Sequence, residues 1–406
     1  MFQAVIISAT TLAALVALML PRVRKAQAWR ATVTPLASII GSGFLVLGPI
    51  LSHSYGKYAP LVMLLLCAAA YAFGSAIRFN ISNMDSHPSR SPAERRTERF
   101  ASWALAFAYC ISVAYYLNLF GAFAVKMTPF NSPAIAKGVT SAALILILAV
   151  GWMRGFSAME RMEEVTVSLK LAIIAGLLAG LSLFFIGQAG QGGLVFAAPS
   201  ETGWAGITLA FGLIITVQGF ETSRYLGEEY KAPLRIRSMR YAQWLSTAIY
   251  MAYVLLLTFA FDAKSVPLTE TAIVDMMKIV SVVLPALLVV AALSAQFSAA
   301  IADTSGAGGL VEELSKGRIP TRGAYLILVL IGLGLTWFSH IFEIISFASK
   351  AFAYYYALQC GIAAFGAFRE AKQPVRGTLY AAFGILAVAI LIFGQPVEGS
   401  SAASPH

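Results

Sequence analysis

Charged side chains lie inside long apolar stretches of the sequence, among them Lys170, Glu221, Arg224 and Lys350. A charge at the centre of a bilayer costs about 2.5–3.5 kcal/mol or more, and residues kept there usually serve ions, protons or polar substrates. Glu221 could therefore be a protonatable coupling group or the counter-charge of a cationic substrate. Alternatively, it could form an internal ion pair with Arg224, which lies three residues further on the same helical face.

Glycines interrupt two of the apolar stretches. One stretch contains Gly41-Ser42-Gly43 and then Gly48-Pro49, and the other contains Gln218-Gly219 immediately before Glu221. Inside a membrane, irregular backbone is tolerated only where it is buried in protein or lines a cavity. The first group of small residues could instead serve close helix packing. Because a second interruption with a charge occurs in a corresponding place, we favour a substrate site that the two breaks form together.

The composition indicates that the apolar segments lie in a lipid bilayer. Of 406 residues, 59% are hydrophobic and 12% are charged, whereas soluble domains carry roughly 25% charged residues. A membrane-spanning helix needs about 20 mostly apolar residues, and such runs recur along the whole chain. We therefore expect an all-α integral membrane protein. About twelve spans are predicted, near residues 2–20, 31–52, 60–80, 101–125, 138–153, 164–186, 204–226, 241–261, 276–302, 323–339, 341–366 and 377–395.

The two interrupted spans are the second and the seventh. This spacing is expected if two five-helix halves form an inverted repeat, each beginning with a discontinuous helix. The predicted ten-helix core covers residues 31–366, with halves at 31–186 and 204–366. An extra helix and a basic loop precede it at 1–30, and a further helix and a short tail follow it at 367–406.

Lys and Arg are distributed unequally between alternate loops. Most of them lie at 21–30, 78–100, 154–163, 227–240, 312–323 and 367–377. The opposite loops carry Lys57, Lys126, Lys137, Lys264 and Lys278. The positive-inside rule makes the first set cytoplasmic and places both termini outside. The net charge of +10 therefore reflects topology, and no nucleic-acid partner is expected.

Residues 2–20 and 81–99 also affect the predicted topology. Residues 2–20 are expected to be a retained span and not a signal peptide, because Arg22, Arg24 and Lys25 follow the apolar run instead of preceding it. The polar stretch 81–99 is expected to be a cytoplasmic loop. The three cysteines lie in apolar runs without metal-ligand spacing, so no disulfide, metal or cofactor is expected.

Four segments resemble, in order, those of the amino acid, polyamine and organocation (APC) superfamily of transporters. They are IIGSGFLVLGP at 39–49, Arg154-Gly155 followed by VTVSLKLAIIAGLL at 165–178, GFETSRYLGEEYKAP at 219–233, and ADTSGAGGLVEELSKGRIP at 302–320. The resemblance implies the five-plus-five (LeuT-like) fold and makes the second run the first core helix. The extra span at 2–20 departs from the family, as does the number of spans that follow it.

The resemblance also implies a substrate site made of backbone groups. In relatives that carry amino acids, the substrate carboxylate rests on free amides of the first broken helix, a favourable place for an anion. The substrate amine meets carbonyls of both broken helices. Carried over to this sequence, the expected amides are those of Ser42, Gly43 and Phe44. The expected carbonyls are those of Ile39, Ile215 and Thr216, with Gly219 and Glu221 beside them.

Lys170 matches the family's buried lysine, whose ammonium takes the place that sodium takes in sodium-coupled relatives. The alternative is a lysine that snorkels to the cytoplasmic interface. Many relatives have a gating aromatic where this sequence has Ile215, so Phe211 or Phe220 could supply the gate. Tyr115, Tyr116 and Asn118 are candidates for the pocket wall, although aromatic packing explains the tyrosines equally well.

The leading functional prediction is a secondary active transporter of the cell membrane that carries an amino acid or related amine by alternating access. It is expected to be sodium-independent and either proton-coupled or an exchanger. Alternatives are a polyamine or inorganic cation transporter of the same fold, or a non-transporting membrane sensor. An enzyme is disfavoured, because the spans contain no metal-ligand cluster and no nucleophile with a paired base. The sequence names neither the substrate nor the oligomeric state.

Overall fold

The computed structural model describes residues 2–41, 43–86, 92–153, 157–226, 230–369 and 371–398, and this part of the chain is helical without a β-strand. The longer helices are α1 (Phe2–Met19), α5 (Ala59–Ser86), α6 (Pro92–Lys126), α7 (Pro133–Met153), α8 (Ser157–Gly190), α10 (Ala232–Ala260), α12 (Leu284–Leu314), α13 (Thr321–Phe338), α14 (Ile341–Arg369) and α15 (Pro374–Phe393). The shorter α-helices are α2 (Pro21–Arg24), α3 (Gln27–Ile39), α4 (Gly43–Tyr55), α9 (Gly203–Gly212) and α11 (Ala272–Val280). The 3-10 helices are η1 (Gly56–Tyr58), η2 (Ile214–Val217), η3 (Phe220–Tyr225) and η4 (Ala263–Ser265).

Ten helices of the described residues are long and apolar enough to cross a membrane. One of these joins α4 and α5 as a single stretch, Gly43–Asn83, and the pieces from α9 to η3 are each too short to be included. With α5 taken separately and α9–η3 added, a helical segment corresponds to every predicted span. The prediction of an all-α membrane protein is confirmed. The division of its core into two inverted halves stays a prediction.

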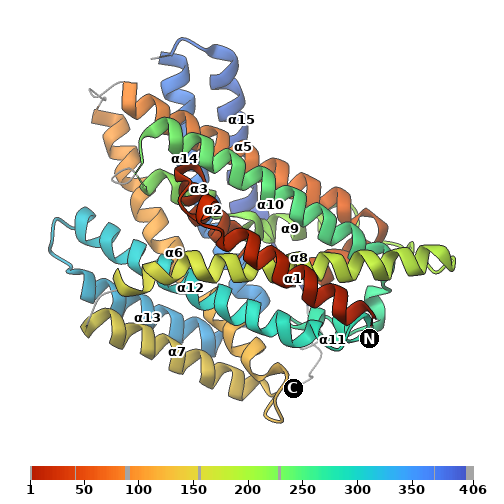
Figure 1. Ribbon diagram of the computed structural model, residues 1–406. Helices are drawn as coiled ribbons and strands as arrows, with labels where there is room; N and C mark the ends of the chain where they lie inside the picture. The colour runs from red at the N-terminus through yellow and green to blue at the C-terminus, as the bar shows by residue number, and fades with distance from the viewer. Residues whose placement is uncertain are drawn as a thin grey trace.

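The helices pack as a bundle in which distant parts of the sequence lie side by side (Figure 1). Helix α5 lies along α10, and α7 packs on α13 at one edge, whereas the pair α14 and α15 joins consecutive helices. Helix α6 runs through the bundle and contacts both α12 and α14. The core is therefore built by contacts between residues far apart in the chain.

Helix α1 is docked along α8 by two glycines. A Cβ atom at Gly176 would lie 2.1 Å from Thr11 Oγ1, and one at Gly180 would lie 2.9 Å from Ile7 Cδ1. Small residues of this kind let membrane helices approach closely. Ile7 is the buried residue of α1, so the other sides of this apolar helix are available to lipid.

Two predicted boundaries are wrong. The stretch 81–99 was expected to be a loop, but α5 continues to Ser86 and α6 begins at Pro92. With 35 residues, α6 is about 52 Å long at 1.5 Å per residue, so it extends beyond a hydrocarbon core of about 30 Å. A helix outside the membrane can be polar on every side, and apolarity alone cannot detect it. The run 276–302 is likewise divided between α11 and α12.

The Gly48-Pro49 pair is explained by Tyr253 of α10. Pro49 lies inside α4 and has no N–H, so the carbonyl of Leu45 loses its helical donor. The Tyr253 hydroxyl donates to this carbonyl at 3.1 Å. Gly48 provides the space, because a Cβ atom there would lie 2.5 Å from the Tyr253 ring. The hydroxyl of a neighbouring helix thus satisfies the interrupted backbone.

The two broken helices meet through their glycines. A Cβ atom at Gly43, the first residue of α4, would lie 2.8 Å from the Cα of Thr216 in η2. Gly219 has φ +116°, and a Cβ atom there would lie 2.5 Å from the carbonyl carbon of Ser38 in α3. The two chain breaks therefore touch each other across the bundle, and each contact requires the absence of a side chain.

We expect Gly219→Ala to lower stability strongly. The positive φ alone costs roughly 1–2 kcal/mol for a residue with a Cβ, and the overlap with α3 adds an overpacking cost of about 1–3 kcal/mol. Gly138→Ala in α7 is the matched control, because nothing lies within 4 Å of its added Cβ atom. Apparent melting temperatures in detergent measure the effect. Equal melting temperatures of both variants would contradict the proposed contact.

Candidate functional site

The hydroxyl of Tyr250 connects the two helix breaks. Tyr250 lies on α10 and is fully buried. Its hydroxyl is 2.9 Å from the carbonyl oxygen of Ile39, at the end of α3, and 2.6 Å from that of Thr216 in η2. These are two of the carbonyls expected to receive a substrate amine. The phenol has one hydrogen to donate, so this hydroxyl serves the two carbonyls by sharing that hydrogen, with the shorter contact to Thr216.

Ser349 of α14 bridges the second break. Its Oγ donates to the carbonyl of Gly212 at 2.7 Å and accepts from the amide of Ile215 at 3.1 Å. The Ile215 carbonyl accepts from the amide of Gln218 at 3.2 Å. Ser349 therefore pairs backbone groups that the end of α9 leaves without helical partners. Its neighbour Lys350 is only partly buried, and nothing in the structure gives this lysine a role.

Glu221 is placed at the start of η3 with no exposed surface. One carboxylate oxygen, Oε2, accepts from the amide of Gly219 at 3.0 Å and from the Tyr356 hydroxyl at 3.1 Å. Within the described residues, the other oxygen, Oε1, is buried without a hydrogen-bond partner. The rings of Phe220 and Phe73 stack against Tyr356, with centroids 5.3 and 5.0 Å away. The carboxylate is thus rigidly held, yet one of its oxygens remains free to accept a proton or a cationic group.

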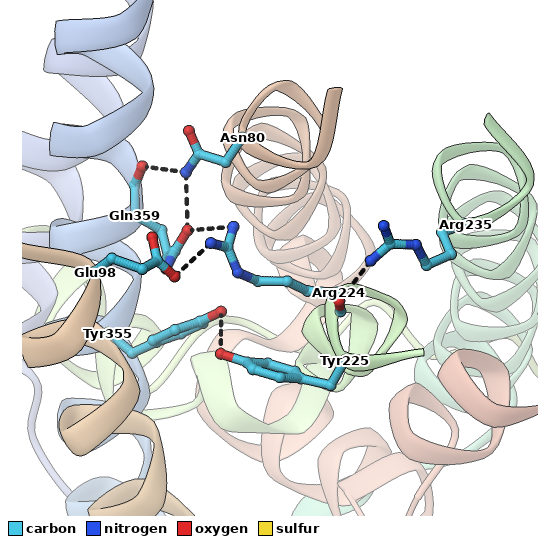
Figure 2. Close-up of polar contacts among 7 residues, drawn as sticks. All are labelled: Asn80, Glu98, Arg224, Tyr225, Arg235, Tyr355 and Gln359. Carbon is cyan, nitrogen blue, oxygen red and sulfur yellow. Dashed lines mark hydrogen bonds and ion pairs between the residues drawn. The ribbon is translucent and has the colours of Figure 1, made fainter. Parts of the chain in front are cut away.

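Arg224 does not take Glu221 as its carboxylate partner. Its guanidinium forms an ion pair with Glu98 of α6 and donates to Gln359 Oε1 at 3.0 Å. Figure 2 shows these side chains converging from three helices, with Asn80 of α5 donating to the same Gln359 oxygen at 2.8 Å. The alternative that Glu221 is present only to balance Arg224 is therefore wrong. The charges of Glu221 and Arg224 belong to different networks.

Lys170 of α8 reaches the end of α3. Its ammonium donates to the carbonyl of Ala37 at 2.8 Å, and the residue is 5% exposed. The last carbonyls of a helix lack helical donors, and a positive charge is favourable there. The side chain therefore points into the protein and does not snorkel to the interface.

A cavity of about 940 Å³ lies beside these groups, between α3, α8, η3 and α12; we call it the vestibule. It is lined by Lys170, Ser38 of α3, Tyr109 of α6, and Asp303 of α12. Arg24 and Arg30 also line it, and they flank a loop that the charge pattern assigns to the cytoplasm. The vestibule therefore opens on the side that the sequence predicts to be cytoplasmic.

The predicted substrate residues lie close together, but they do not line the vestibule. Gly43 packs on Thr216, and the ring of Phe44 lies 5.4 Å from that of Tyr250. Ile39 and Ile215 are buried. Ser42 lies outside the described residues, as do 154–156 and 227–229 of the family-like segments. The structure thus brings the described members together in a closed junction.

The predicted pocket-wall residues have mainly structural contacts. Tyr115 and Tyr116 are buried with ring centroids 5.2 Å apart, and the Tyr116 hydroxyl accepts from Gln218 Nε2 at 3.0 Å. Asn118 donates to Thr336 of α13 at 2.9 Å. Of the gate candidates, Phe211 lines a separate apolar cavity of about 500 Å³, and Phe220 is buried against Tyr356.

Sequence reasoning missed Tyr250, Ser349 and Glu98 and did not assign Asp303 to the site. The two hydroxyl residues are ordinary in membrane helices, and no sequence signal distinguishes them. Glu98 lies in a stretch mistaken for a loop. Asp303 directly follows the predicted apolar run 276–302 and lies in the family-like segment 302–320. No group of three or more His, Cys, Asp or Glu that could hold a metal ion is found within the described ranges.

Comparison with known proteins gives two matches that cover most of the chain. Residues 21–394 match a protein family described as "APC superfamily transporter". An uncharacterized protein of Aquifex aeolicus (strain VF5) is 39% identical over 385 residues, which cover 93% of each chain. Helix α1 lies before residue 21, so its contact with α8 involves a helix outside the region that the family matches.

We predict that Arg224 and Glu98 are energetically coupled. Arg224→Gln and Glu98→Gln should each reduce stability by about 1–3 kcal/mol, and the double variant should recover much of the loss. This loss of stability is smaller than the roughly 3–5 kcal/mol expected when a fully buried ion pair is broken. The reason is that the Glu98 side chain keeps 20% exposure, so water screens the pair. Melting temperatures in detergent report the cycle. If the double variant Glu221→Gln/Arg224→Gln recovered a similar amount of stability, that result would show that Arg224 pairs with Glu221 instead.

Proposed function

The chain belongs to the APC superfamily of transporters, and we propose that it carries an amino acid or related amine across the cell membrane by alternating access. Transport is sodium-independent and is driven by protons or by exchange. The observation that carries this proposal is the contact of the Lys170 ammonium with the carbonyl of Ala37. It supplies, at the broken end of α3, the positive charge that a bound sodium ion would otherwise supply.

The backbone groups at the junction support a substrate with an amine and a carboxylate. The amides of Gly43 and Phe44 begin α4, where N–H groups lack helical partners and favour an anion. The carbonyls of Ile39 and Thr216 favour a donor. An ammonium can replace the Tyr250 hydroxyl there, because charge-assisted hydrogen bonds are roughly twice as strong as neutral ones.

Alternating access follows from the same geometry. Gly43 is in contact with Thr216, so the two breaks must separate before a substrate can lie between them. The vestibule gives water a path to Ser38, one residue before Ile39. We therefore assign the structure to a state in which the vestibule is open towards the predicted cytoplasmic side and the junction is closed.

A cationic substrate is the second candidate. The buried Oε1 of Glu221 lacks a partner among the described residues, and it could receive a polyamine nitrogen or an inorganic cation. This alternative uses the same junction and vestibule. It differs from the first in making Glu221, and not the carbonyls, the main recognition group.

Uptake should not depend on sodium. Purified protein in proteoliposomes, with an inwardly directed proton gradient, is tested against a panel of radiolabelled amino acids and amines. Replacement of sodium by choline is expected to leave the initial rate unchanged for any compound that is carried. Loss of uptake in choline, while the proton gradient is maintained, would remove the role assigned to Lys170.

A further inference from the structure

Asp303 of α12 lines the vestibule, and η3, which carries Glu221, borders the same cavity through Thr222 and Tyr225. Asp303 is 5% exposed, whereas Glu221 has no exposed surface and is absent from the lining. The two carboxylates lie within electrostatic range of each other. Water in the vestibule can therefore contact Asp303 directly, while Glu221 can be reached only through other protein groups.

Hydroxyl groups surround the two carboxylates. Ser112 of α6 donates to Asp303 Oδ2. Tyr109 and Tyr116 each lie within electrostatic range of both acids, and Tyr109 also lines the vestibule. A phenol hydroxyl can accept one proton and donate another. The space between Asp303 and Glu221 is therefore bordered by groups that can pass a proton.

A proton is the ligand that fits this arrangement. The two carboxylates carry like charge in a buried region, so ionising both together is costly. A metal ion would need several oxygen ligands and a cavity to hold it, but Glu221 is absent from the lining of the vestibule. A proton needs no cavity, and Oε1 of Glu221 offers a buried acceptor without a hydrogen-bond partner among the described residues.

We propose that Asp303 passes protons between the water of the vestibule and Glu221. A hydronium ion in the vestibule protonates the Asp303 carboxylate and becomes water. The new O–H bond then breaks as the proton moves to Glu221 Oε1, directly or through a tyrosine hydroxyl that gains one proton and loses another. No electrons are exchanged, and each step is reversible. The inference rests on the proton coupling in the proposed function.

Other charged groups border this path. Lys170 of α8, together with Arg24 and Arg30, also lines the vestibule. Arg224 is on the same 3-10 helix as Glu221 but pairs with Glu98. Tyr109, Tyr116, Tyr225 and Tyr356 are the neutral titratable groups around the acids. Asp303 is therefore the acidic side chain among the described residues that line the vestibule.

Time-resolved infrared spectroscopy tests this path without a substrate. The purified full-length protein in detergent is acidified rapidly, and the carbonyl stretch of protonated carboxylic acids is followed. The Glu221 band is identified by its absence in Glu221→Gln. In Asp303→Asn the Glu221 band should reach its full size but form on the order of 10²-fold more slowly, the lower end of what a positioned proton-transfer group contributes. Asp303→Glu should restore most of the rate.

Two controls keep the test independent of folding defects. Glu313→Gln removes an exposed carboxylate from the same helix and should change nothing. In protein with Asp303 intact, the Asp303 band, identified by its shift in Ser112→Ala, should rise before the Glu221 band. The relay is refuted if the Glu221 band forms equally fast in Asp303→Asn and in protein with Asp303 intact, or if the Glu221 band rises before the Asp303 band. Neither result affects the proposed function. If Glu221→Gln removes no carboxylic acid band, both the relay and the proposed coupling role of Glu221 are refuted.

Discussion

The structure depends on satisfying the backbone of two broken helices where no bulk water is present. Unpaired backbone groups in such a place cost several kcal/mol each, so side chains must supply the missing partners. Tyr250 shares one O–H hydrogen between a carbonyl of each break, Ser349 pairs two groups of the second, and Lys170 reaches the end of the first. The glycines at 43 and 219 allow the breaks to meet closely enough for one phenol to serve both.

This arrangement explains how a static junction can belong to a transporter. Few side-chain hydrogen bonds close it, and the most central of them comes from the Tyr250 hydroxyl. The charges around it have separate tasks. Arg224 and Glu98 fasten η3 to α6, Lys170 fixes the end of α3, and Glu221 retains a buried oxygen that has no hydrogen-bond partner among the described residues. Mutations of Arg224 and of Glu221 should therefore have different consequences, although the two residues lie three positions apart.

The sequence predicted the junction because its features are anomalous in an apolar run. Glycine pairs, Glu221 and Lys170 are each unfavourable in an ordinary membrane helix, and so they stand out without a structure. Tyr250 and Ser349 could not be predicted, because hydroxyl side chains are common in such helices and their partners are distant in the chain. The contact of Glu98 could not be predicted for a different reason. Helix α6 extends past the membrane, and its polar end has the composition of a loop. The partner of Arg224 therefore required the packing of α6 against η3.

The central claim is that Tyr250 holds the two breaks together. The most direct measurement is the apparent melting temperature of Tyr250→Phe in detergent, with Tyr354→Phe as the control, since Tyr354 is 44% exposed. Loss of the Tyr250 hydroxyl leaves buried carbonyls without a donor, at about 1–3 kcal/mol for each unsatisfied group. The account predicts a clear fall in melting temperature for Tyr250→Phe and almost none for the control. Equal melting temperatures of Tyr250→Phe and the wild type would contradict it.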